Sequence, residues 1–186
     1  MNRIMTLQIS YCELEDLIWR EVKINEDSTL DDLAYLILAS FDTMANHLYR
    51  FEVEGESYYC ANTEIEEDEK ISNCKISDLE LQPGDEIIME YDFGIGHEFS
   101  ICVLSIVEDE SLIDRVPLII HGEGRGIIDD CSAEDIGFAI EEIDITGKLR
   151  EPIIYKGTEW DYRDFNIKTA NDDLHKEIEE MEKRFS

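Results

Sequence analysis

The chain has 186 residues, a mass of 21.6 kDa and 43% apolar residues, which is enough material for one packed core. Its 46 acidic residues outnumber its 16 basic residues, so the formal net charge at pH 7 is -30. A surface of this sign repels phosphate groups, which argues against direct binding of nucleic acid. The charge is typical of a strongly solvated surface or of a protein that binds a basic partner.

The five cysteines show neither CxxC pairs nor the density of a secreted disulfide scaffold, which predicts reduced thiols. No apolar run approaches the ~20 residues that a membrane-spanning helix needs. The first ten residues alternate between apolar and polar types and lack the apolar block of a signal peptide. We therefore expect a soluble cytoplasmic protein without a membrane segment.

Alternating apolar and polar residues predict strands over 4–11 and 17–24, and the polar residues between them predict a β-hairpin. Ser28 or Thr29, each followed three residues later by an aspartate, then marks the start of a helix. Apolar side chains follow at helical spacing: Leu30, Leu33, Ala34, Ile37 and Phe41. This helix should lie across the hairpin.

Two further strands are predicted over 47–53 and 57–60, and a third over 87–93. The acidic run 64–69 predicts a solvated loop, with a lure for a basic partner as the alternative. The order of these elements, with the hairpin and the helix before them, predicts a β-grasp-like mixed sheet with one packed helix.

The second half of the chain extends this sheet. Residues 99–107 are apolar on both sides of a strand pattern, which predicts a central strand, and 117–120 predict a short extended segment. Ser132 with Asp135 resembles a capping box that opens an amphipathic helix, and a last helix is predicted from near Asn171.

The fold class predicted from these elements is α+β, with the whole chain, 1–186, as a single domain. Its first half, 1–93, is the β-grasp-like region. Its second half, 94–186, adds further strands, a glycine-rich loop and two C-terminal helices.

Short motifs follow one another in a fixed order over nearly the whole chain. They are Trp19-Arg20, Leu30-Asp31-Asp32-Leu33, His47-Leu48-Tyr49-Arg50-Phe51, Tyr91-Asp92-Phe93-Gly94 with Glu98, Gly122-Glu123-Gly124, Asp129-Asp130-Cys131, and Phe165 with Asn171 and Leu174. This ordered set resembles the Ri-plasmid ORF-three-like family, a group of largely uncharacterised proteins associated with mobile elements. The resemblance implies a shared fold and does not imply a particular reaction.

The chain departs from the family pattern near its centre. Ile95, His97 and Phe99 stand where the family has a second aspartate, a tryptophan and a histidine. Gly126, Ile127 and Ile128 replace a cysteine and two prolines of the glycine-rich loop. Some members are called TnpR-like, a name that suggests a recombinase, but this chain has neither a basic DNA-binding segment nor a helix-turn-helix signal.

The polar candidates for a ligand site gather in two loops, around 92–98 and 121–131. They are Tyr91, Asp92, Glu98, His121, Glu123, Arg125, Asp129 and Asp130. With His97 and Cys131 they include ligand types suited to zinc or another divalent ion, but their spacing matches no known metal motif. The alternative is structural, with Asp92 and Glu98 pairing with Arg125 or with backbone donors to hold the two loops together.

Two other kinds of chemistry fit the second loop poorly. The sequence Gly122-Glu123-Gly124-Arg125-Gly126 lacks the lysine and hydroxyl of a phosphate-binding loop, and its glutamate would face a phosphate with like charge. Cys131, at a helix start, would need a neighbouring base to act as a nucleophile. No catalytic residue and no cofactor is assigned from the sequence.

The leading hypothesis is therefore a non-enzymatic interaction or binding module whose protein partner is unknown, with a basic partner fitting the charge best. The first alternative is a metal- or small-ligand-dependent enzyme that uses the loops 92–98 and 121–131. The second alternative, from charge alone, is an acidic DNA mimic that inhibits a basic protein.

Overall fold

The computed structural model describes residues 3–61, 63, 66 and 69–185. Their helices are α1 (Leu30–Ser40), α2 (Ala133–Thr146) and α3 (Ile167–Phe185). Their strands are β1 (Arg3–Tyr11), β2 (Trp19–Asn25), β3 (Tyr49–Val53), β4 (Glu56–Tyr59), β5 (Lys70–Ile71), β6 (Glu86–Tyr91), β7 (His97–Glu108), β8 (Leu118–Glu123), β9 (Ile154–Tyr155) and β10 (Thr158–Glu159). The α+β class is confirmed. The loop predicted over 64–69 falls mostly outside the described residues.

Eight strands form one mixed sheet in the order β5-β4-β3-β6-β7-β1-β2-β8, and β9 and β10 form a separate hairpin. All neighbours in the large sheet are antiparallel except β4 and β5. The predicted opening hairpin is present, since β1 pairs with β2 from Ile4 opposite Asn25 to Ser10 opposite Trp19.

The β-grasp label is not confirmed, because the strands of residues 1–93 do not form a sheet of their own. β7, from the second half of the chain, lies between β1 and β6 and pairs antiparallel with both. The opening hairpin therefore meets β3, β4 and β6 only through β7. Alternating patterns indicate which side of a strand is buried, and they carry no information about its neighbours.

Thr29 is the residue that starts α1. Its hydroxyl accepts the Asp32 N–H at 3.1 Å, and the Asp32 carboxylate accepts the Thr29 N–H at 2.7 Å, which completes a capping box. Ser132 and Asp135 form the same arrangement at the start of α2, as the sequence predicts. The starts of α1 and α2 therefore follow from local sequence alone.

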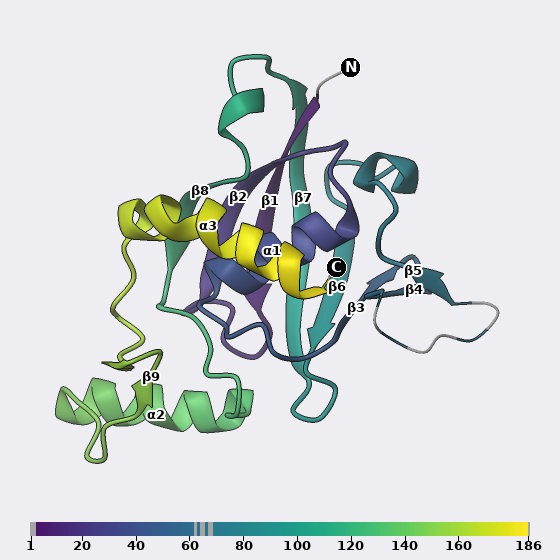
Figure 1. The fold of residues 1–186 in the computed structure, drawn as a ribbon. Coiled ribbons are helices and arrows are strands. Elements are labelled where there is room, and N and C mark those ends of the chain that lie inside the picture. Colours follow the sequence, from purple (N-terminus) through teal and green to yellow (C-terminus); the bar gives the residue numbers. More distant parts are fainter. Residues whose placement is uncertain (1–2, 62, 64–65, 67–68, 186) are drawn as a thin grey trace.

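Two helices, α1 and α3, cover the same face of the sheet and contact each other, where the sequence predicts one packed helix (Figure 1). The core lies between them and the sheet. The other face of the sheet carries exposed side chains such as Glu98 on β7, and Leu104 of the same strand is 41% exposed. β7 is central, as predicted, but only one of its two apolar sides is buried.

Two of the predicted boundaries that differ from the structure have clear physical reasons. β6 ends at Tyr91 and not at residue 93, because Asp92 adopts a left-handed backbone with φ 56° and Phe93 is left 43% exposed. α3 begins at Ile167, ahead of Asn171, since the side-chain oxygen of Asn166 accepts the Thr169 N–H at 3.1 Å. Asn171 instead ties α3 to β8 through two hydrogen bonds with the backbone of Ile119.

Candidate functional site

The glycine-rich segment 122–126 is wrapped around a buried arginine. Arg20 has no exposed surface, and its guanidinium donates to the carbonyl oxygens of five residues at 2.6 to 3.1 Å. The five are Trp19, Ser40, Glu123, Gly124 and Arg125. The rings of Phe165 and Phe41 lie 3.7 and 4.9 Å from its central carbon. Burial lowers the pKa of Arg20, and the ring of carbonyls stabilises its charged form.

Three glycines of this segment have no room for a side chain. A Cβ on Gly122 would lie 2.8 Å from the Arg20 Cδ, one on Gly124 would lie 2.3 Å from the Leu17 carbonyl oxygen, and one on Gly126 would lie 2.1 Å from the Phe41 carbonyl oxygen. The segment is therefore packed tightly against neighbouring chain segments, and its glycines serve this close approach.

Four of the sequence-predicted site residues contact one loop, residues 42–46, or the residue that follows it. The Asp129 carboxylate accepts the Met44 N–H at 2.7 Å, and the Tyr91 hydroxyl accepts the Asn46 N–H at 3.2 Å. Arg125 Nε donates to the Asp42 carboxylate at 2.9 Å, and the Asp92 carboxylate lies 3.6 Å from His47 Nε2. The structure thus brings Tyr91, Asp92, Arg125 and Asp129 together as supports of this loop.

The backbone of loop 42–46 is held in an uncommon conformation. Asp42 and Ala45 are left-handed, with φ of 59° and 50°. Beyond the bonds from Asp129 and Tyr91, Arg184 of α3 donates to the carbonyl oxygens of Met44 and Ala45 at 2.6 and 3.0 Å. A left-handed residue that carries a side chain costs of order 1–3 kcal/mol and persists when surrounding contacts fix it.

A buried histidine, His97, is linked to this loop through Asp129. His97 Nε2 lies 2.9 Å from the Asp129 carbonyl oxygen, which can only accept, so the proton sits on Nε2. Its Nδ1 then accepts from the Tyr11 hydroxyl at 2.8 Å. Desolvation lowers the pKa of His97, which keeps the ring neutral. Both ring nitrogens are engaged, and the Asp129 Oδ1 atom has no hydrogen-bond partner within the described residues.

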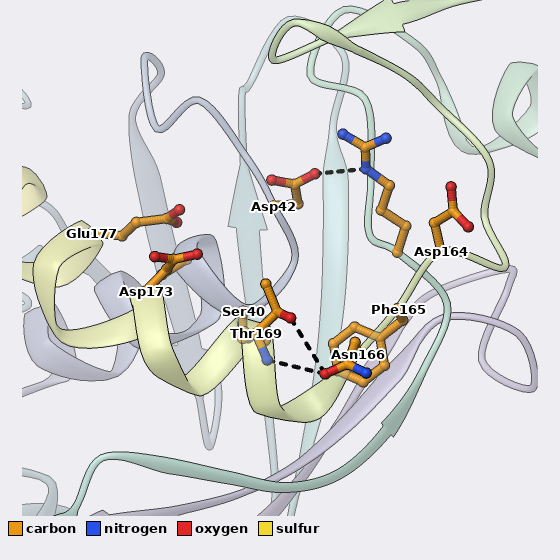
Figure 2. Close-up of a pocket in the computed structure, with 11 residues that line it drawn as sticks. Ser40, Asp42, Asp164, Phe165, Asn166, Thr169, Asp173 and Glu177 are labelled. Carbon is orange, nitrogen blue, oxygen red and sulfur yellow. Dashed lines mark hydrogen bonds and ion pairs between the residues drawn. The ribbon is translucent and has the colours of Figure 1, made fainter.

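Loop 42–46 forms one wall of a groove that runs along α3. The groove has two adjoining cavities, with volumes of about 220 Å³ and about 310 Å³. The smaller is lined by Ala39, Ser40, Asp42, Arg125, Asp164, Phe165, Asn166, Thr169, Ala170, Asp173 and Glu177, and the larger by Thr43, Met44, Asn46, Lys156, Glu177, Glu180, Met181 and Arg184. Figure 2 shows Glu177 and Asp173 projecting from α3, with Asp42 on a neighbouring segment.

Carboxylates outnumber cations around this groove. The five acidic residues are Asp42, Asp164, Asp173, Glu177 and Glu180, and the three basic ones are Arg125, Lys156 and Arg184. Lys156 Nζ lies 2.9 Å from Asp42 and 3.7 Å from Glu177, so it spans the junction between the two cavities. Burial raises the pKa of Glu177, the carboxylates of Asp42 and Asp173 raise it further, and Lys156 opposes them.

The model of the family described as Plasmid pRiA4b ORF-3-like protein matches residues 3–174. The chain belongs to this family. A protein of unknown function from Methanosarcina mazei Go1, MM3350, has a similar solved structure, with a TM-score of 0.74 and 20% sequence identity. The likeness covers 90% of this chain and 96% of the other, and it concerns the fold alone. No curated protein matches the chain.

The motifs that carry the family resemblance have structural roles in this chain. Trp19-Arg20 and Gly122-Glu123-Gly124 supply the buried arginine and carbonyls that bind it. Phe165 stacks on that arginine, and Asn171 bonds β8. In this chain these residues therefore lie where segments distant in the sequence are joined.

In the described part of the chain, the remaining predicted site residues make no hydrogen bond or ion pair with loop 42–46 that holds it in place, and they come from different parts of the structure. Glu98 is on the uncovered sheet face, opposite Glu90 of β6, and β1 and β2 separate its strand from β8. His121 is exposed on β8, opposite Glu21, and Glu123 and Asp130 are also exposed. Among the described residues no three His, Cys, Asp or Glu side chains are grouped so that they could hold a metal ion.

The structure also bears on two other interpretations of these loops, the pairing of Asp92 and Glu98 with Arg125 or backbone donors, and Cys131 as a nucleophile. Asp92 accepts the Gly94 N–H at 3.0 Å, a backbone donor, whereas Arg125 pairs with Asp42 and not with Asp92 or Glu98. Burial raises the pKa of the Cys131 thiol, and the carboxylates of Asp135 and Asp130 raise it further. The helix start therefore does not activate this thiol, because burial and the two neighbouring carboxylates both disfavour the thiolate.

Of the residues that line the groove, only Arg125 is among the candidates predicted from the sequence, and three of the missed ones show why. Asp42 follows α1, a position where aspartate tolerates the left-handed conformation, and this is a weak local signal for the loop. Glu177 is expected to face water with the acidic side of α3, but it is half-buried. Lys156 lies in the β9–β10 hairpin, whose two-residue strands are too short to predict.

None of the helices in the described ranges is long and apolar enough to cross a bilayer.

Proposed function

We propose that this protein is a non-enzymatic binding module that receives a basic segment of a partner protein in the groove along α3. The observation that carries the proposal is the excess of carboxylates around two adjoining cavities, beside a wall whose backbone is fixed before any partner arrives. A preorganised site loses less conformational entropy on binding than a mobile one.

The fixed wall supports a binding role. Loop 42–46 is bonded from three directions, by Asp129, by Tyr91 and by Arg184 of α3. Asp42, the first residue of this loop, lines the smaller cavity and pairs with Lys156, which lines the larger one. A lysine or arginine of a partner can take the place of Lys156 between Asp42 and Glu177, because it offers the same charge and N–H donors of the same kind.

The polar groups nearest the loop support binding more than catalysis. His97 is desolvated and uses both ring nitrogens within the protein, so it has no free position for proton transfer with a substrate. The Cys131 thiol has a raised pKa, which disfavours the nucleophilic thiolate. The groove instead offers carboxylates, whose ordinary task at a surface is to pair with cations.

A titration of a fluorescein-labelled lysine- and arginine-rich peptide, followed by anisotropy at about 0.15 M salt, tests this proposal. The double variant Asp164→Asn/Asp173→Asn removes two groove carboxylates. Glu52→Gln/Glu86→Gln removes two exposed carboxylates from β3 and β6 and is its matched control, since both have the same net charge. We expect the groove variant to bind about 2- to 30-fold more weakly, because exposed ion pairs contribute about 0.2–1 kcal/mol each.

The control variant should retain the affinity of the unmodified chain within about twofold at this salt concentration, since screening weakens the contribution of distant charges. Equal losses in the two variants would mean that the peptide senses the overall charge of -30, and the groove proposal would then be abandoned.

A further inference from the structure

The second helix, α2, carries apolar side chains on the face that points away from the protein. Its inward face buries Ile136, Ile140 and Ile143. On the outward face Phe138 is 60% exposed and Ile145 is 75% exposed. Isolated exposed apolar residues are ordinary, but these two are about two helical turns apart and therefore share one stripe of the helix. The helix lies beyond the edge of the sheet, away from α1 (Figure 1).

Acidic side chains alternate with the two apolar ones along this stripe. Glu134 precedes Phe138, and Glu141 lies between Phe138 and Ile145, each at a spacing of about one helical turn that places all four together. Glu134 and Glu141 are exposed, and α2 contains no lysine or arginine. Arg150, which follows the helix, lies 3.5 Å from Glu142 at its side. The outer face of α2, defined as Glu134, Phe138, Glu141 and Ile145, is thus apolar and acidic.

The apolar and acidic composition of this face indicates which kind of partner it can bind. A second copy of the chain would bring Glu134 and Glu141 of one molecule against those of the other, and like charges without water or counter-charges between them destabilise a contact. A partner with apolar side chains flanked by lysine or arginine satisfies both features. Phe138 and Ile145 are about 10.5 Å apart along the helix axis, which matches apolar residues two turns apart on another helix.

We propose that the outer face of α2 binds a basic amphipathic helix of a partner protein. Phe138 and Ile145 pack against the apolar stripe of that helix, and Glu134 and Glu141 pair with its basic flanks. α2 supplies no residue to either cavity of the groove along α3, so this surface is separate from the site of the proposed function.

The test uses a fluorescein-labelled helical peptide of about 18 residues, made of leucine and lysine with leucines at i, i+3, i+4 and i+7. A second peptide of the same composition has its leucines scattered around the helix. We expect the full chain to bind the amphipathic peptide and to bind the scattered one about tenfold more weakly, because only the first buries its apolar side chains together.

Variants then locate the contact. Phe138→Gln/Ile145→Gln keeps good helix formers on α2 and should weaken binding of the amphipathic peptide by about tenfold. Leu104→Thr/Val107→Thr removes two exposed apolar residues from β7 and is the matched control, expected to bind as the unmodified chain does. Circular dichroism confirms that each variant is folded.

Equal binding by the α2 variant and the control would overturn the proposal, as would equal affinity for the two peptides. Analytical ultracentrifugation tests whether a second copy of the chain binds this face instead. A dimer of the unmodified chain that Phe138→Gln/Ile145→Gln dissociates would also overturn the proposal. The groove variant Asp164→Asn/Asp173→Asn should leave the preference for the amphipathic peptide intact, so the groove can fail its own test without affecting this one.

Discussion

The glycine-rich segment 122–126 and loop 42–46 touch through Arg125 and Asp42, yet they use their polar groups in opposite ways. In the segment, carbonyl oxygens converge on the buried Arg20, and the space beside each of three glycines is filled by protein. In the loop, the backbone is held from outside and one side opens onto a groove. The glycine-rich segment, which stands out in the sequence, is packed against other parts of the protein. Loop 42–46, which does not stand out, lines a cavity.

This contrast shows that unusual residue types can mark packing constraints as readily as ligand sites. A segment that must pass close to other backbone needs glycine, and a buried arginine needs carbonyl oxygens placed around it. A loop that lines a groove needs only to be held in place by residues elsewhere, so its own side chains can be ordinary. The predictions below test whether the first region is structural and the second accessible.

Replacement of Arg20 by methionine should have the largest effect. Four of its five carbonyl partners lie outside β2, and in the variant they lose the arginine donor, two of them, Ser40 and Gly124, in buried contacts. We expect a loss of at least ~3 kcal/mol in the free energy of unfolding, measured with urea. Arg50→Met is the matched control, because Arg50 pairs with Glu90 on the uncovered sheet face and should cost no more than about 1 kcal/mol. Similar losses in both would contradict a structural role specific to Arg20.

Replacement of Asp129 by alanine should come next. It removes the acceptor for the Met44 N–H and for the Tyr155 hydroxyl, and we expect a loss of about 2 kcal/mol. Amide hydrogen exchange in loop 42–46 should accelerate, since the bond from Asp129 is one of its supports. Asp130→Ala, at the exposed neighbouring position, should leave both the stability and the exchange unchanged. Unaltered exchange in the Asp129 variant would show that the loop is held by its other contacts.

Local signals predict the elements of this fold well. Alternation places β1, β2 and β3, and capping boxes place α1 and α2, because each signal involves residues a few positions apart. The position of β7 between β6 and β1 depends on pairing over long sequence distances, which no local pattern encodes. The β-grasp prediction is not confirmed because it places no strand between β1 and β6.

The candidate site is predictable only in part, for a similar reason. Tyr91, Asp92, Arg125 and Asp129 stand out in the sequence as polar residues, but their target, loop 42–46, contains no glycine to indicate left-handed backbone. Its conformation is imposed by Asp129 and by Arg184, which lies 140 positions after Met44. Contacts of this kind become visible only when the chain is folded.

His97 should produce a smaller effect that depends on pH. Its pKa in the folded protein lies below its ordinary value of 6.5, so the unfolded chain binds more protons between the two values. The stability that His97 contributes is therefore present above pH 6.5 and is lost as the pH falls toward the folded pKa. Urea unfolding between about pH 7.5 and 5.5 should show a slope that His97→Gln reduces by up to about 1.4 kcal/mol per pH unit. His121→Gln, the same substitution at an exposed position, is the matched control.

The smallest effect on stability should come from Lys156→Gln, and it is the most direct test of whether the groove is open. Lys156 is partly exposed, so loss of its pairs with Asp42 and Glu177 should change the free energy of unfolding by no more than about 1 kcal/mol. Affinity for the lysine- and arginine-rich peptide should rise about two- to threefold, because the peptide no longer competes with Lys156 for these carboxylates. Lys70→Gln makes the same change in net charge on β5 and should not raise the affinity to this extent. Equal gains in the two variants would mean that the peptide does not enter the groove, and loop 42–46 would then be as closed to ligands as the glycine-rich segment that supports it.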